Sequence, residues 1–295
     1  LFVTTPAPGE PFDMAEENPV AMIEALERVA FEAAEDARAQ GCIAAEFRIA
    51  PLLFEAHGMA GEAAVEALLA GLRRSALPSG LIVCAMRHLP VEQTLRAARL
   101  ALAYKDRGVI GFDLAGAEFG HPPSEHAQAL RAARDGGLPL TLHAGEADAA
   151  ERVVEALRLG AARIGHGIRL VDALQDPQRR GLVDEVIERG AHLEVCPTSN
   201  VHTGAAASIA VHPITALWRG GVSVGVNTDN RLMSCITLDS ECAALLEHTP
   251  LVLHDLARMQ LEAARHSFLP QAIKADAVAA LTAFIAGLPP SSQRV

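Results

Sequence analysis

The stretch VEQTLRAARLALAYKDRGVIGFDLAG, residues 91–116, combines the two elements that decide the fold. In residues 91–108 apolar side chains recur at every third or fourth position, which predicts an amphipathic helix. Glycine closes this helix, and the apolar run at 109–116 then predicts a short buried strand. A helix followed at once by a buried strand is the repeating unit of an α/β protein with a parallel sheet.

The same alternation of helix and strand continues along most of the chain. Seven strands are expected, at residues 42–50, 81–88, 109–116, 138–145, 163–167, 192–200 and 222–230. A closed (β/α)₈ TIM barrel needs one strand more. The helical segment 19–41 precedes the first of them and should lead into the second strand of such a barrel. We therefore expect a (β/α)₈ TIM barrel whose strand one is missing from the N-terminal end of this chain.

Composition indicates a single acidic domain that binds a small molecule. No Pro/Gly/Ser-rich linker divides the chain, so residues 1–295 are expected to form one barrel domain, incomplete at its N-terminus. Acidic residues outnumber basic ones 36 to 25, which disfavours a nucleic-acid partner. No apolar run approaches the roughly 20 residues that a membrane span needs. The five cysteines are odd in number and widely spaced, which favours a reducing, cytoplasmic location, and no obligate protein partner is expected.

Polar side chains gather at the carboxyl ends of the expected strands, where TIM-barrel enzymes build their active sites. They include His143, Glu146, His166, Asp229 and Asn230. Histidine and aspartate are ligands that zinc accepts, and a bound metal would lower the pKa of a water to about 7. Glu146 could then carry the proton. From position alone, Glu146 could equally be a residue of a first helical turn that offsets the helix dipole, and a single strand-end histidine is more often structural.

Other chemistries lack their sequence patterns. No G-x-S-x-G elbow surrounds Ser199, and Cys196 precedes a proline inside an apolar run, which predicts a buried and inert thiol. The stretch around His143 has no G-x-G-x-x-G and no Walker lysine, so dinucleotide or triphosphate binding is not indicated.

Six motifs in fixed order resemble those of adenosine deaminase, a family of the metal-dependent amidohydrolase superfamily, in its bacterial form. They are GFDLAGAE (111–118), LHAGE (142–146), GHGIRL (165–170), LEVCPTSNVHTGA (193–205), HPI (212–214) and VNTDNRLMS (226–234). The resemblance extends from about residue 42 to about residue 270.

The resemblance implies a (β/α)₈ barrel with one zinc ion. It also implies hydrolytic deamination of adenosine or deoxyadenosine to inosine or deoxyinosine and ammonia by a zinc-activated water. By the same resemblance His143 and Asp229 are zinc ligands, and Glu146 is the proton donor to the purine ring. His166 would orient or stabilise the attacking hydroxide.

Two further positions are implied to contact the purine. The backbone of Gly116 would approach a ring nitrogen, which the absence of a side chain permits. Asn230 stands where many members carry a second aspartate, and its amide offers N–H donors without any need for protonation.

The chain departs from the family pattern at its N-terminal end. The family carries an H-x-H pair on strand one, which supplies two more zinc ligands, and no such segment is present here. Two ligands are too few for a catalytic zinc, so the ligand count and the strand count both predict a missing N-terminal segment. Three hypotheses remain: an adenosine deaminase without its N-terminus, a catalytically inactive nucleoside-binding relic, and a deaminase of adenine or of a modified adenosine.

Overall fold

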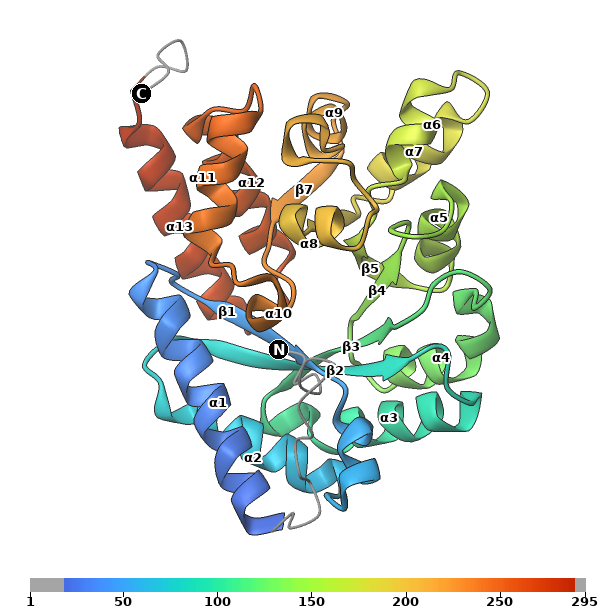
Figure 1. The fold of residues 1–295 in the computed structure, drawn as a ribbon, viewed down its shortest axis with the longest axis vertical. Helices are drawn as coiled ribbons and strands as arrows, with labels where there is room; N and C mark the ends of the chain where they lie inside the picture. The colour runs from blue at the N-terminus through green and yellow to red at the C-terminus, as the bar shows by residue number, and fades with distance from the viewer. Residues whose placement is uncertain (1–18, 290–295) are drawn as a thin grey trace, which may run out of the picture.

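The computed structural model describes residues 19–289, and these contain one curled, parallel sheet of seven strands surrounded by helices (Figure 1). The strand order follows the chain, from β1 to β7. The strands are β1 (Ala45–Ile49), β2 (Ser79–Met86), β3 (Val109–Ala115), β4 (Leu140–Ala144), β5 (Ala161–His166), β6 (His192–Val195) and β7 (Ser223–Val226). All seven expected strands are confirmed, and the TIM-barrel-like architecture with them.

The sixth and seventh strands are shorter than the sequence predicts. The expected strand at 192–200 ends at Val195, because Pro197 begins the helix α8 (Pro197–His202). Proline favours the first turn of a helix, where its missing N–H has no partner to lose. The expected strand at 222–230 likewise ends at Val226, and residues 227–230 form the loop that leads to α10 (Arg231–Ser234).

The curled sheet stays open between β1 and β7. Each strand from β2 to β6 pairs with both of its neighbours in the chain, and within residues 19–289 no strand pairs across the gap between the first and the last. A side chain satisfies one backbone group near this edge, since Gln260 Nε2 donates to the carbonyl of Val226 at 2.8 Å. The gap borders the cavity that holds the candidate site.

Helices cover the outside of the sheet (Figure 1). The longer ones are α1 (Pro19–Ala39), α2 (Gly61–Arg74), α3 (Val91–Ala103), α4 (Ala127–Asp135), α5 (Ala150–Arg158), α7 (Arg180–Glu188), α11 (Leu238–His248), α12 (Leu253–His266) and α13 (Gln271–Gly287). Shorter elements are η2 (Pro51–His57), η3 (Lys105–Arg107), η4 (Pro123–His126), α6 (Leu170–Gln175), η5 (Ile209–Val211) and α9 (Ile214–Arg219). Between residues 19 and 289, no helix combines the length and the apolar character required to cross a membrane.

The helices α1 and α2 are in direct contact at Gly71. A Cβ atom added to Gly71 would lie 2.1 Å from the carbonyl oxygen of Glu27 and 2.8 Å from the Cβ of Ala30. Neither backbone atoms nor an alanine methyl group can rotate away, so the two helices must separate if this glycine gains a side chain.

We expect Gly71→Ala to lower the free energy of unfolding by about 1–3 kcal/mol, the usual result of overpacking a buried contact. Urea unfolding followed by circular dichroism measures the change. Gly181→Ala is the matched control, because nothing lies within 4 Å of an added Cβ there and alanine favours α7. Equal stability of both variants would show that α1 and α2 are less closely packed than described.

Candidate active site

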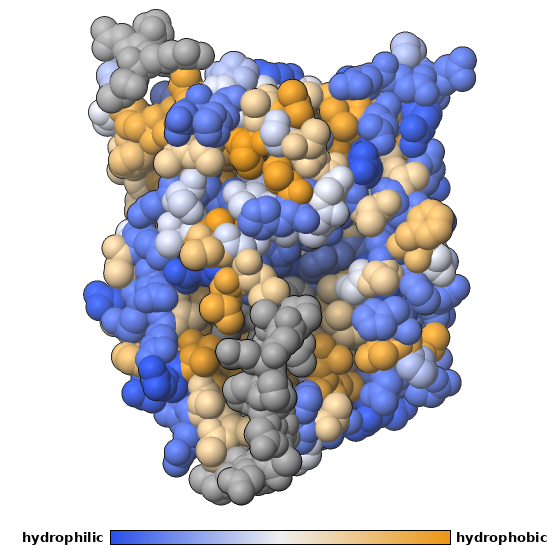
Figure 2. Space-filling model, in the orientation of Figure 1, coloured by the Kyte–Doolittle hydropathy of each residue, from blue (hydrophilic) through white to orange (hydrophobic). Residues whose placement is uncertain are grey.

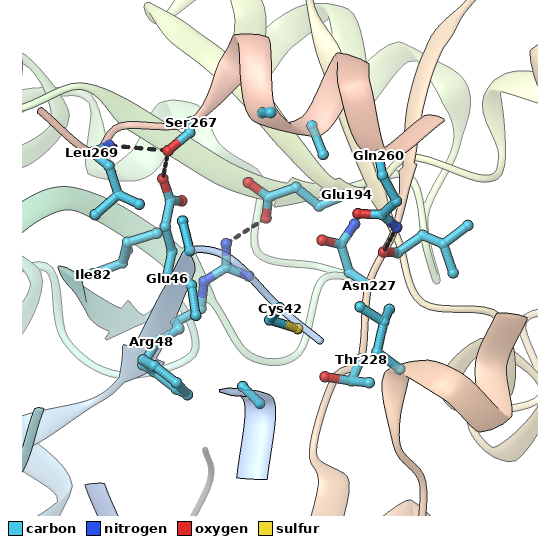
Figure 3. A pocket seen from close by; sticks show the side chains of 18 of the residues that line it. Cys42, Glu46, Arg48, Ile82, Glu194, Asn227, Thr228, Gln260, Ser267 and Leu269 are labelled. Atoms are coloured by element: carbon cyan, nitrogen blue, oxygen red, sulfur yellow. Dashed lines mark hydrogen bonds and ion pairs between the residues drawn. The ribbon is translucent and has the colours of Figure 1, made fainter. Parts of the chain in front are cut away.

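The C-terminal ends of β4, β5 and β7, together with most of β1, line a cavity of about 410 Å³ beside the gap in the sheet. His143 on β4, His166 at the end of β5 and Asp229 after β7 all line it. Figure 3 shows charged side chains of its inner wall, among them Glu46, Arg48 and Glu194. In the orientation of Figure 2, a hollow flanked by hydrophilic residues opens near the middle of the face.

His143 is oriented by a buried carboxylate. Its Nδ1 atom lies 3.0 Å from Asp113 Oδ2, and Asp113, on β3, in turn pairs with Arg48 Nε at 3.1 Å. Burial alone would raise the pKa of Asp113, but Arg48 and His143 outweigh it and lower that pKa to about 2. The ionised carboxylate can only accept, so Nδ1 of His143 donates the hydrogen bond. The Nε2 atom of His143 is therefore left as the acceptor, as in histidines that bind metals.

Arg48 belongs to a chain of ion pairs inside the sheet. Its Nη2 atom pairs with Glu194 Oε2 at 2.5 Å, and Glu194 Oε1 pairs with Arg163 Nε at 2.6 Å. Arg163 Nη2 reaches Glu46 Oε2 at 2.6 Å. Burial opposes ionisation of Glu194, but Arg163 and Arg48 outweigh it and hold the pKa of this carboxyl well below its usual range. The interior charges therefore alternate in sign from Glu46 to Asp113.

Asp229 is held by a helix that follows the neighbouring strand. Ser199 Oγ, on α8, donates to Asp229 Oδ2 at 2.7 Å. Burial would raise the pKa of Asp229, but nearby His166 and the Ser199 hydrogen bond lower it. An ionised carboxylate therefore faces the same cavity as the two histidines.

His166 adopts a backbone conformation that is rare outside glycine. Its φ angle is +63°, and the residue is buried. Such a conformation costs of order 1–3 kcal/mol, and residues that adopt it cluster at functional sites. It places the His166 ring centroid 5.1 Å from that of His143. Burial lowers the pKa of His166, so the ring is neutral at pH 7.

A series of hydrogen bonds selects the tautomer of His166. The Ile214 N–H donates to His212 Nδ1 at 3.1 Å, so His212 Nε2 is the donor to Asn200 Oδ1 at 3.2 Å. The Asn200 amide nitrogen then donates to His166 Nδ1 at 3.1 Å and to Glu146 Oε1 at 2.8 Å. The proton of His166 consequently lies on Nε2, which is 3.6 Å from Glu146 Oε2.

Glu146 lies in the turn between β4 and α5, with its carboxylate fixed from α8. Thr203 Oγ1 adds a second hydrogen bond to Oε1 at 3.0 Å, beside that of Asn200. Neither Asn200 nor Thr203 was assigned a role from the sequence. The signal that could have found them is the polar run after β6, in the stretch CPTSNVHTG.

His143, His166 and Asp229 therefore line one cavity, and Glu146 lies beside it in contact with His166. Gly116 and Asn230 lie outside the lining of the cavity. Gly116 has a φ angle of +92°, and an added Cβ would lie 2.7 Å from His88 Nδ1, so the position requires glycine. Asn230 caps α10, because its Oδ1 accepts the Met233 N–H at 3.0 Å. The purine contacts of both residues stay predictions.

The donor set of the described residues fits only part of a zinc site. The Asp113 contact gives His143 the orientation typical of a metal ligand, and Asp229 faces the same cavity. Residues 19–289 contain no group of three or more His, Cys, Asp or Glu side chains arranged to hold a metal ion. A catalytic zinc normally has three protein ligands, so these two donors do not complete a site by themselves.

A parallel, barrel-like sheet with histidines and carboxylates at its C-terminal strand ends is typical of TIM-barrel enzymes, metal-dependent hydrolases among them. The chain belongs to the adenosine deaminase family, whose model matches residues 10–283.

Relatives in sequence and in structure agree with this assignment. An adenosine deaminase from Mycobacterium sp. (strain JLS) is 42% identical over 262 residues, which cover 84% of this chain and 72% of the relative. The crystal structure of an adenine deaminase from Arthrobacter aurescens has a TM-score of 0.80 at 26% identity, and covers 90% of this chain and 80% of that one. An amidohydrolase from Burkholderia ambifaria with bound Zn also has a TM-score of 0.80, at 25% identity, with 90% and 74% covered.

We expect the interior ion pairs to make the free energy of unfolding depend on pH in the acid range. Asp113 and Glu194 have lower pKa values in the folded state than in the unfolded state, so their contribution is complete above pH 5 and is lost as the pH falls from about 4 to 2. Glu194→Gln should weaken this pH dependence and cost about 3–5 kcal/mol at pH 7, because it breaks a buried pair. Urea midpoints at pH 7, 5 and 3 measure both effects.

The exposed Glu247 supplies the control for this experiment. Glu247→Gln should leave the urea midpoints at all three pH values close to those of the unaltered chain. Identical behaviour of the Glu194 and Glu247 variants would contradict the strong pairing inside the sheet.

Proposed function

We propose that this protein deaminates adenosine or deoxyadenosine hydrolytically, yielding inosine or deoxyinosine and ammonia, with the aid of one zinc ion. The observation that carries the proposal is the convergence of Glu146, His166, the oriented His143 and Asp229 at one end of the sheet. Membership of the adenosine deaminase family supports it.

Each residue has a role that its contacts support. Glu146 takes up a proton from the attacking water and passes it to the purine ring, and Asn200 and Thr203 fix one of its carboxylate oxygens so that the other is directed toward His166. His166, neutral and protonated on Nε2, orients the attacking water or hydroxide. His143 and Asp229 would hold the zinc ion, which when bound supplies a water with a pKa of about 7.

Two substrate contacts complete the proposal. The backbone of Gly116 approaches a purine nitrogen, and the amide of Asn230 donates to another. Asn230 Oδ1 accepts the Met233 N–H, and the purine contact is assigned to the amide nitrogen because that is the donor of the side chain.

Two other functions are favoured by specific observations. Among the described residues, His143 and Asp229 are two candidate zinc ligands where a catalytic zinc normally has three, which favours a nucleoside-binding protein without catalysis. The structural likeness to an adenine deaminase favours a different 6-aminopurine as substrate. Chromatography of reactions with adenosine, deoxyadenosine and adenine, with added zinc, distinguishes the substrates. Inosine binding measured by calorimetry without any turnover would identify a binding protein.

We expect Glu146→Gln to lower turnover of adenosine by about 10²–10⁴-fold, because an amide cannot transfer the proton. Loss of adenosine absorbance measures the rate, and thermal unfolding measures the fold, which should be unchanged. Glu151→Gln is the matched control, since Glu151 is an exposed neighbour on α5 that pairs with Arg179. Full turnover by the Glu146 variant would remove this residue from the mechanism.

We expect Asn230→Asp to change the binding free energy of adenosine by about 1–3 kcal/mol while zinc binding stays the same. Aspartate is as good a helix cap as asparagine, so α10 should persist. Calorimetry measures the affinity, and metal analysis measures zinc. Loss of zinc with unchanged affinity would mean that Asn230 and Asp229 have exchanged roles.

A further inference from the structure

We propose that Glu118 is a positioning residue for the deamination: its carboxylate fills an anion-binding turn after β4 and thereby fixes the place of Glu146. The inference rests on the proposed function of Glu146. Glu118 lies in the loop after β3, 27 to 30 residues from the amides that it binds.

The carboxylate of Glu118 accepts four successive backbone N–H groups. Its Oε1 atom accepts the N–H of Gly145. Its Oε2 atom accepts the N–H groups of Glu146, Ala147 and Asp148 at 3.0, 2.8 and 3.1 Å. Successive amides that converge on one point form a concave site for an anion. Glu118 is only 6% exposed, so water does not replace it as the partner of these amides.

Glycine makes this turn possible. Gly145 has a φ angle of +70°, a conformation that side chains rarely adopt, and an added Cβ would lie 2.6 Å from Val153 Cγ2. This conformation directs the following amides to a single side. Glu118 is the acceptor of these amides, so the geometry of the turn depends on it.

A second buried side chain fixes the start of the same segment. Arg87 is 1% exposed, and its Nη2 atom donates to the carbonyl oxygens of His143 and, at 2.8 Å, of Leu114. Arg87 therefore binds the carbonyls of the next-to-last residues of β3 and β4, while Glu118 binds the amides that follow β4. The opposite charges of the two side chains also attract each other.

Glu146 is consequently held at both of its ends. Its own N–H is one of the four donors to Glu118, which fixes its Cα atom relative to β3. Asn200 and Thr203, on the other side of the site, fix its carboxylate. A displacement of about 1 Å at a reacting group can cost 10²-fold in rate, so loss of Glu118 should reduce kcat even though Glu118 does not touch the substrate.

The experiment compares Glu118→Ala, Glu118→Gln and Asp255→Asn with the unaltered chain. Asp255 is the matched control, because it is a buried carboxylate that accepts the Val252 N–H at 3.1 Å and the Trp218 Nε1–H at 3.0 Å and pairs with Arg219 at 2.9 Å. None of these partners is a site residue. Hydrogen–deuterium exchange reports the amides of residues 145–148, and steady-state kinetics with adenosine report kcat and KM separately.

We expect exchange at residues 145–148 to accelerate at least about tenfold in Glu118→Ala, because the amides lose their acceptor. The kcat value should fall on the order of 10²-fold while KM changes less than about threefold. Glu118→Gln keeps one acceptor oxygen, so its exchange rate and its kcat should lie between those of Glu118→Ala and those of the unaltered chain. Asp255→Asn should leave both the exchange of 145–148 and kcat unchanged.

Chemical rescue separates positioning from a general structural role. Acetate should enter the space left in Glu118→Ala and restore part of both the exchange protection and kcat. Acetamide, which has one acceptor oxygen and no charge, should restore less than acetate, and sodium chloride at equal ionic strength should restore neither. Unchanged exchange at 145–148, unchanged kcat, or equal rescue by acetamide would each overturn the proposal. If Glu118→Ala does not fold, the same two measurements are made on Glu118→Gln. Unchanged exchange at residues 145–148 or unchanged kcat in that variant would overturn the proposal.

The two readouts also distinguish the two proposals. If the unaltered chain does not deaminate adenosine, the proposed function fails, and with it the catalytic consequence assigned to Glu118. The exchange measurement does not depend on turnover, so it still decides whether Glu118 fixes the turn that carries Glu146.

Discussion

The ion pair between Arg48 and Asp113 is the interaction on which the rest of the site depends. A carboxylate with no exposed side-chain surface is costly unless a cation pairs with it, and Arg48 provides that cation at 3.1 Å. Glu194 and Arg163 extend the pairing through the interior, so each buried charge has a partner of opposite sign. Because Asp113 stays ionised, it can orient His143, and the orientation of that histidine follows from a contact with the neighbouring strand.

The same interaction explains why the curled sheet is needed. Arg48 lies on β1, Asp113 on β3 and Glu194 on β6, so no pair of adjacent strands could bring them together. The curvature of the parallel sheet carries strands that are far apart in order to opposite sides of one interior. The cost of burying these charges is thus offset only after most of the sheet has formed, which couples the site to the fold.

Much of this arrangement could be predicted from the sequence. The seven apolar runs identified the strands, and the rule that carboxyl ends of parallel strands share one edge brought His143, His166 and Asp229 together correctly. The end of β6 was predicted poorly, since an apolar run gives no warning that Pro197 starts a helix. The hydrogen-bond partners of these residues were not predictable, because Asn200 and Thr203 reach Glu146 across more than 50 residues of chain.

Asn200 shows why such partners cannot be inferred from residue type alone. Its oxygen accepts from His212, and its nitrogen donates to both His166 and Glu146, so a single amide connects three groups with a fixed direction of donation. An aspartate at this position could accept from His212 but could donate to neither of the others. His166 would then lose the contact that keeps its proton on Nε2, and two carboxylates would face each other beside it. The chemistry of the site therefore depends on an amide whose importance is visible only when all three partners are in place.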